Sequence, residues 1–199
     1  SVGNHLFMTI QWMLSSFANE GKAFFIAIWA AGFLLLVKSK KAKVYQSLAV
    51  VFSVVALLPY AGISFFSEMG IGYIDIEQCL TELPTWQTMT TQNRIAFFWW
   101  IAAVLFTLVL LWKVTGHSVF ISMAFLGGIA SEAVLHFSPT IYASGARVYY
   151  LTDLMYLFII LWMVMRMDSE KKKNLFIAGA AALGIINFLS QYSIMLLKL

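Results

Sequence analysis

The chain has 199 residues, of which 61% are hydrophobic and only 11% are charged, and its mean hydropathy is +0.84. This composition is more apolar than the core of a soluble domain of this length requires, so it argues against a soluble fold and predicts an integral membrane protein. The formal net charge of +4 comes from loops between apolar runs, so we expect no nucleic-acid partner.

The first expected element is an amphipathic helix over 5–19. Its apolar residues recur at helical spacing and its polar residues lie opposite: Leu6, Ile10, Met13, Leu14 and Phe17 against His5, Thr9, Ser16 and Asn19. This pattern predicts a helix that lies in the membrane interface.

Six apolar runs follow, and their lengths suit helices that cross a hydrocarbon layer of about 30 Å. They cover 23–37, 44–66, 95–112, 118–137, 148–165 and 175–197. The first is short, and Pro59 predicts a kink in the second. We therefore predict an all-α integral membrane protein: one domain over 1–199, a six-span transmembrane helical bundle with interfacial helices on its outer face.

The second interfacial helix is expected within 67–94, the longest segment between two runs. Asp75 can cap it, an apolar side follows at helical spacing, and Pro84 ends it: the apolar residues are Ile76, Cys79, Leu80 and Leu83. Cys79 is the only cysteine of the chain, so no internal disulfide can form.

The orientation follows from the lysines and arginines. Nine of the 13 lie in or beside the loops after the first, third and fifth runs: Lys38, Lys40, Lys41, Lys43, Lys113, Arg166, Lys171, Lys172 and Lys173. By the positive-inside rule these loops are cytoplasmic and both termini lie outside, in a membrane that we expect to be the bacterial cytoplasmic membrane. An outside N-terminus without a cleavable signal predicts that the chain is part of a longer polytopic protein.

The last three runs carry their polar residues at the outer end. Glu132 and His136 stand four residues apart on one helix face, and Arg147 and Asp153 flank the start of the fifth run. The sixth run adds a further pair four residues apart, Asn187 and Gln191. Ionisable groups within a membrane usually face a bundle interior or a wet cavity, so this one-sided cluster predicts a site rather than a relay across the bilayer.

Two interpretations of the cluster stay open. Arg147, with Tyr149 and Tyr150 beside it, suits a phosphate or pyrophosphate group, because a guanidinium makes bidentate contacts. Glu132, His136 and Asp153 are then the catalytic candidates that position a sugar hydroxyl or move a proton, and Asn187 and Gln191 join the substrate-binding set.

In the other interpretation, Glu132 or Asp153 pairs with Arg147 and ties two helices together. A divalent metal held by Glu132, His136 and Asp153 is a further alternative, although the spacing is a weak signal and we predict no cofactor.

The stretches 136–142 (HFSPTIY) and 144–150 (SGARVYY) resemble a segment between two late spans of bacterial polytopic GT-C glycosyltransferases. The resemblance covers 135–154 and the order of the runs. It implies transfer of a sugar from a polyprenyl-phosphate donor on the outer face, with Arg147 at the donor phosphate and His136 beside the reacting sugar. The family's catalytic carboxylate lies in its first outer loop, which has no counterpart in this chain.

The sequence therefore predicts a membrane glycosyltransferase module for cell-surface glycans, and a polymerase or ligase of lipid-linked glycans would use the same arginine. Its partners would be membrane lipids, the polyprenyl-phosphate-linked sugar and the remainder of a longer chain. The alternative is a non-enzymatic transporter, lipid-export subunit or assembly subunit, in which the outer cluster is a structural ion-pair network.

Overall fold

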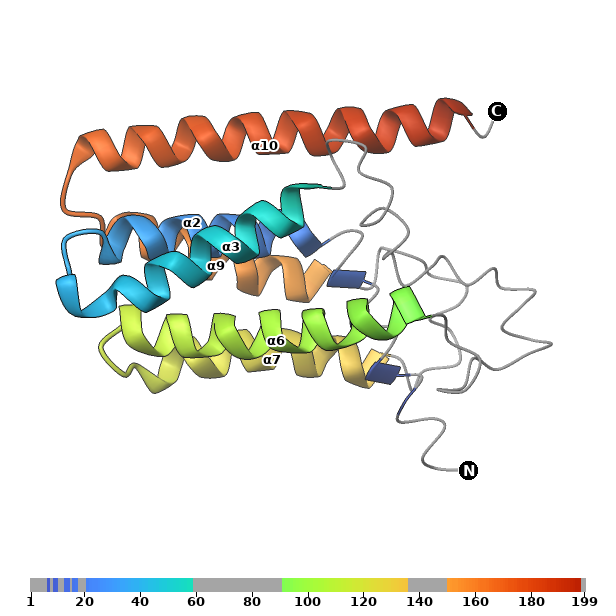
Figure 1. The fold of residues 1–199 in the computed structure, drawn as a ribbon, viewed down its shortest axis with the longest axis horizontal. Coiled ribbons are helices and arrows are strands. Elements are labelled where there is room, and N and C mark those ends of the chain that lie inside the picture. Colours follow the sequence, from blue (N-terminus) through green and yellow to red (C-terminus); the bar gives the residue numbers. More distant parts are fainter. Residues whose placement is uncertain are drawn as a thin grey trace.

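A computed structural model describes residues 7, 9, 10, 13, 14, 16, 17, 21–58, 91–135 and 150–197; it leaves out the side chains of 92, 93, 135, 187 and 190–197. Within these residues the protein is all-helical, with six long α-helices, one short 3-10 turn and no strand (Figure 1). The elements are α2 (Lys22–Leu36), η2 (Lys40–Ala42), α3 (Lys43–Leu57), α6 (Thr91–Val114), α7 (Val119–Leu135), α9 (Tyr150–Met165) and α10 (Glu170–Leu197).

Each of the six predicted runs overlaps one of these helices, so the prediction of six long helices is confirmed. α10 begins at Glu170, before the predicted run at 175, because the polar residues ahead of the run also favour a helix. Glu170 in the first turn complements the helix dipole, and its Oε1 lies 2.7 Å from the Nζ of Lys173. The predicted kink at Pro59 and the predicted interfacial helix around Asp75 lie outside the described residues.

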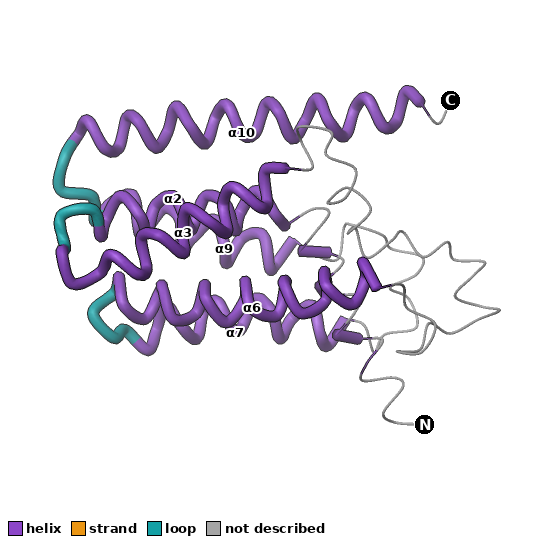
Figure 2. The backbone as a smooth tube through the Cα atoms, viewed as in Figure 1, coloured by secondary structure: helices purple, strands orange, loops and turns teal. Residues whose placement is uncertain are grey.

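Three helical hairpins form the bundle, and their connections lie at one end. α2 leads into α3, α6 into α7 and α9 into α10, and Figure 2 shows the three connections side by side at the left. α2 is central, because it packs against α3, α6, α9 and α10. The basic loops of the sequence therefore gather at a single end of the bundle, as the alternation of runs predicts.

An aromatic cluster fills the centre of the bundle around Phe25, which has no exposed surface. Five rings from the N-terminal segment, α2, α6, α7 and α9 surround it, with centroids 5.2 to 6.1 Å from its own: Phe17, Trp29, Trp100, Phe125 and Tyr156. Tilted and edge-to-face pairs at these distances are favourable for aromatic rings. One side chain of α2 thus joins most of the helices to one core.

α2 and α6 approach closely at two buried points. The indole Nε1 of Trp29 donates a hydrogen bond of 2.8 Å to Thr107 Oγ1, and that hydroxyl donates to the Ala103 carbonyl at 2.7 Å. One turn further along α2, a Cβ built on Gly32 would lie only 2.7 Å from Leu110 Cδ2. The backbones can come this close because Gly32 has no side chain.

The outside of the bundle is apolar, whereas several polar side chains are inside. Large apolar side chains with more than half of their surface exposed occur on five helices, for example Val44, Phe98, Leu105, Phe120, Val134, Leu154, Met165, Leu175 and Phe188. Thr107, Ser122, Glu132 and Thr152 are buried. Soluble proteins expose single apolar residues but rarely a whole apolar exterior.

By length and apolarity, one helix among the described residues could cross a bilayer, over Arg94–Val114 in α6. Three further apolar helices are shorter: Lys22–Leu36, Val119–Val134 and Tyr150–Met165. The all-helical class is therefore confirmed, while a crossing by six helices belongs to the proposal below.

Candidate functional site

Among the predicted site residues that the structure describes, Glu132 is the most deeply buried, with 2% of its surface exposed near the C-terminal end of α7. Ser16 from the N-terminal segment donates a hydrogen bond of 2.9 Å from its Oγ to Glu132 Oε1. A carboxylate inside a bundle needs such donors, because burial without them is costly. The N-terminal segment thus provides part of the surroundings of Glu132.

This contact changes the interpretation of the N-terminal segment. Its described residues between Phe7 and Phe17 are helical, as predicted. However, Thr9 and Ser16, from the side expected to face water, are 8% and 9% exposed, and Leu14 and Phe17 from the apolar side are also buried. Both sides of this segment are covered, because the polar side meets a buried carboxylate. His5, Leu6 and Asn19 lie outside the described residues.

Asp153 lies in the first turn of α9 and is half-buried. The neighbouring Thr152 is buried and joins α9 to α7: its Oγ1 donates to the Gly128 carbonyl at 3.0 Å and lies 3.1 Å from Ser131 Oγ. Ser131 Oγ also donates to Gly128 O at 2.7 Å. These hydroxyls hold the two acid-bearing helices in a fixed register.

Tyr156 follows one turn after Thr152, and 1% of its surface is exposed. Its ring packs against Phe24, Phe25 and Phe125, and its hydroxyl has no hydrogen-bond partner within the described part of the chain. Sequence reasoning missed both Thr152 and Tyr156. Tyr149 and Tyr150 were predicted because they follow Arg147 closely, whereas a tyrosine within an apolar run gives no such signal.

The structure brings together only part of the predicted site. Glu132 at the end of α7 and Asp153 at the start of α9 lie at the end of the bundle opposite the basic connections (Figure 1). Tyr150 begins α9 and is 71% exposed. His136, Arg147 and Tyr149, and the side chains of Asn187 and Gln191, lie outside what the structure describes.

The helix of the sixth run, α10, lies apart from α7 in the bundle. Figure 1 shows α10 at the opposite edge of the bundle from α7, and the main neighbour of α10 is α2. Asn187 and Gln191 share an end of the bundle with Glu132, on a helix at the other edge. The sequence places residues at one depth, but it does not order the helices around the bundle.

The metal alternative has no support among the residues that are described, where no group of three His, Cys, Asp or Glu side chains is close enough to hold an ion. His136, which that alternative requires, is not among them. The polar groups that remain are two carboxylates, two hydroxyls and one phenol on adjacent helices. Such groups can accept a proton and hold hydroxyls of a ligand.

Two adjacent glycines in α7 allow a test of the packing between α7 and α9. A Cβ on Gly128 would lie 3.3 Å from Tyr156 Cε1 and 3.6 Å from Thr152 Cγ2, whereas nothing lies within 4 Å of one on Gly127. We expect Gly128→Val to lower the free energy of unfolding by about 1–3 kcal/mol through overpacking. The matched Gly127→Val should change it by less than about 0.5 kcal/mol. Unfolding in mixed micelles with SDS measures both, and equal effects would contradict the α7–α9 packing.

Comparison of the chain with protein-family models, curated proteins and solved structures yields no match.

Proposed function

We propose that this chain is an integral membrane module whose six helices cross the bilayer. The support is the apolar exterior around a core that holds Thr107, Glu132 and Thr152. In hydrocarbon this distribution is favourable, because polar side chains must find partners inside the bundle while apolar ones meet lipid. α6, the described helix that is both long and apolar enough to cross, would be joined by the other five helices of the bundle.

The basic connections give the proposed module its orientation. Nine of the 13 lysines and arginines lie in or beside the three connections at one end of the bundle. Positive residues in short loops favour the cytoplasmic side. The opposite end, with Glu132 and Asp153, then faces the outside.

For this outer end we propose the binding of a polyprenyl-phosphate-linked sugar, in a GT-C-like glycosyltransferase module that assembles or modifies cell-surface glycans. One observation carries the proposal: Glu132 is 2% exposed inside a bundle with an apolar exterior. An ionisable group retained in such a place is expensive and is by default a functional candidate. The half-buried Asp153 on the adjacent helix provides a second carboxylate.

In the proposed reaction, an acceptor hydroxyl oxygen attacks the anomeric carbon of the sugar. The bond from that carbon to the phosphate oxygen breaks, and polyprenyl phosphate leaves with the bonding electrons. The acceptor's proton passes to a carboxylate, for which Glu132 and Asp153 are the candidates. Arg147 is the proposed partner of the departing phosphate, because its guanidinium can make two parallel hydrogen bonds to it.

The second candidate function is a non-enzymatic transporter or assembly subunit. The hydrogen bond from Ser16 to Glu132 Oε1 favours it, because it gives the buried carboxylate a role in tying the N-terminal segment to α7. Under this function the outer carboxylates stabilise the bundle and do not touch a ligand.

Native mass spectrometry of the protein in mild detergent distinguishes these functions. We expect a bound isoprenoid phosphate in the unaltered protein that is lost in Arg147→Ala without a change in thermal stability. Arg166→Ala is the matched control, because Arg166 stacks on Trp162 at 4.7 Å at the opposite end of the bundle. An Arg147→Ala variant that unfolds, from a protein that carries no such lipid, would favour the structural function. A protein that stays soluble without detergent would overturn the membrane module itself.

A further inference from the structure

A long apolar groove runs along the bundle between α2, α3 and α10. Its volume is about 510 Å³, within the range of small-molecule clefts. Residues of all three helices line it, among them Ala30, Leu34, Val54, Leu57, Leu175 and Ala182. The polar lining groups are the hydroxyl of Ser53 and the indole of Trp29, and the indole N–H is already bonded to Thr107. The groove therefore suits a hydrocarbon ligand.

The length of the groove suits one acyl chain of a lipid. On α10 the lining extends from Leu175 to Ile186, which is about 17 Å at 1.5 Å per residue. The hydrocarbon core of a bilayer is about 30 Å thick, so this length corresponds to the acyl chains of one leaflet.

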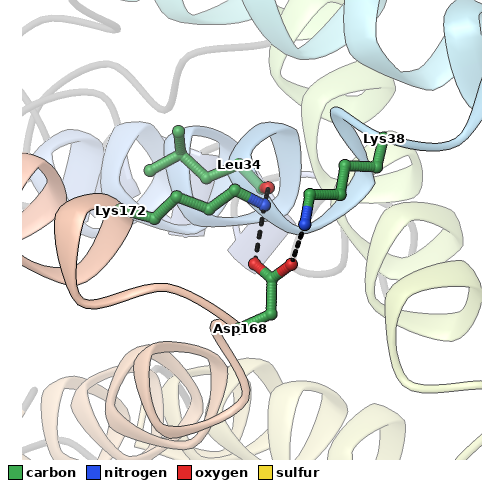
Figure 3. Close-up of polar contacts among 4 residues, drawn as sticks. All are labelled: Leu34, Lys38, Asp168 and Lys172. Carbon is green, nitrogen blue, oxygen red and sulfur yellow. Dashed lines mark hydrogen bonds and ion pairs between the residues drawn. The ribbon is translucent and has the colours of Figure 1, made fainter.

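One end of the groove is basic. Lys172 Nζ donates a hydrogen bond of 2.9 Å to the carbonyl of Leu34, a lining residue, and lies 2.9 Å from Asp168 Oδ1 (Figure 3). Lys38 reaches Asp168 Oδ2 at 2.6 Å, and the two lysines hold the pKa of that carboxyl well below its usual range. The side chain of Lys38 remains 76% exposed, so it is available to an anion as well.

Lys171 lies just beyond the basic end of the groove, on α10. It precedes the lining residue Leu175 by four positions, so it stands one turn away on the same face of α10. It is exposed and makes no ion pair with any described residue. Around the three connections, nine cations face only two acids, Asp168 and Glu170, so this end attracts anions.

We propose that the groove holds one acyl chain of an anionic phospholipid from the leaflet at the basic end, with the lipid phosphate at Lys171 and Lys38. The proposal rests on the membrane placement argued above and is independent of glycan chemistry. Bulk lipid is as apolar as the groove, so the acyl chain alone gives little preference. Selectivity for this lipid comes from the lysines, and the groove fixes where the chain lies.

Lipid titration followed by native mass spectrometry tests the site. Phosphatidylglycerol and phosphatidylcholine with identical acyl chains are added to the protein in neutral detergent. We expect phosphatidylglycerol to bind more tightly, and Ala182→Phe to reduce its binding to the level of phosphatidylcholine because the ring fills the groove. Ala181→Phe is the matched control, since Ala181 is exposed on α10 and does not line the groove.

If Ala182→Phe fails to fold, a variant that removes one charge still tests the site. Lys171→Gln should weaken phosphatidylglycerol binding about fivefold, the effect of one lysine near an anionic lipid. Lys113→Gln removes the same charge at the same end but on α6, and should have a smaller effect. Equal binding of the two lipids, equal effects within either variant pair, or a dimer that Ala182→Phe dissociates would overturn the site. None of these results depends on Arg147. The proposed glycan function is therefore tested separately, by the Arg147→Ala experiment.

Discussion

Phe25→Ala is expected to lower the free energy of unfolding by about 3–5 kcal/mol, the usual cost of truncating a buried phenylalanine. Phe25 has no exposed surface and lies within about 6 Å of five other rings. Its removal leaves a cavity between the N-terminal segment and four helices, which the rigid rings around it cannot fill. SDS titration in mixed micelles, followed by circular dichroism, measures the change.

Phe98→Ala is the matched control, because Phe98 lies on α6 with 59% of its surface exposed. It removes the same atoms from the outside of the bundle, so we expect a loss below about 1 kcal/mol. Losses of similar size in the two variants would contradict a core centred on Phe25. A larger loss for Phe98→Ala would indicate that the outer face of α6 is covered in the native assembly.

The sequence predicts the helices of this protein well because the loops are distinct from the runs. Charged residues are concentrated between the apolar runs, so the limits of each run are visible in the composition. The basic loops alternate with the others, and this alternation correctly places three connections at one end of the bundle.

The order of the helices around the bundle could not be predicted in the same way. Outward side chains are as apolar as inward ones, so a periodic pattern does not identify the core face. Phe97 is 8% exposed and its neighbour Phe98 is 59% exposed, yet the two are the same residue type. For this reason the sequence could not indicate that α10 and α7 lie at opposite edges of the bundle.

In the N-terminal segment the sequence shows a polar face but not what that face contacts. Its polar side is distinct in the sequence, and in a peripheral helix that side faces water. Here Ser16 faces the buried carboxylate of Glu132 at 2.9 Å. A pattern of polar residues indicates that a polar partner exists, but it cannot say whether the partner is solvent or a side chain 116 positions away.

Glu132→Gln separates the two proposed functions, because a large loss of activity is expected under only one of them. Glu132→Gln keeps an oxygen that can accept the hydrogen bond from Ser16, so we expect the fold to persist. It removes the group that takes the proton, and general-base catalysis contributes a factor of about 10²–10⁴ to the rate. The release of polyprenyl phosphate from a lipid-linked sugar, measured in the full-length protein, should fall by that factor.

Two further variants give this prediction its controls. Glu170→Gln makes the same change at an exposed acid of α10 at the opposite end and should leave release unchanged. Ser16→Ala removes one hydrogen bond to the buried carboxylate while keeping the carboxylate, and should lower stability by about 1–3 kcal/mol. If Glu132→Gln transfers sugar at the normal rate while Ser16→Ala destabilises the bundle, Glu132 is a structural acceptor. The buried carboxylate then ties the N-terminal segment to α7, and the chemistry must come from another residue.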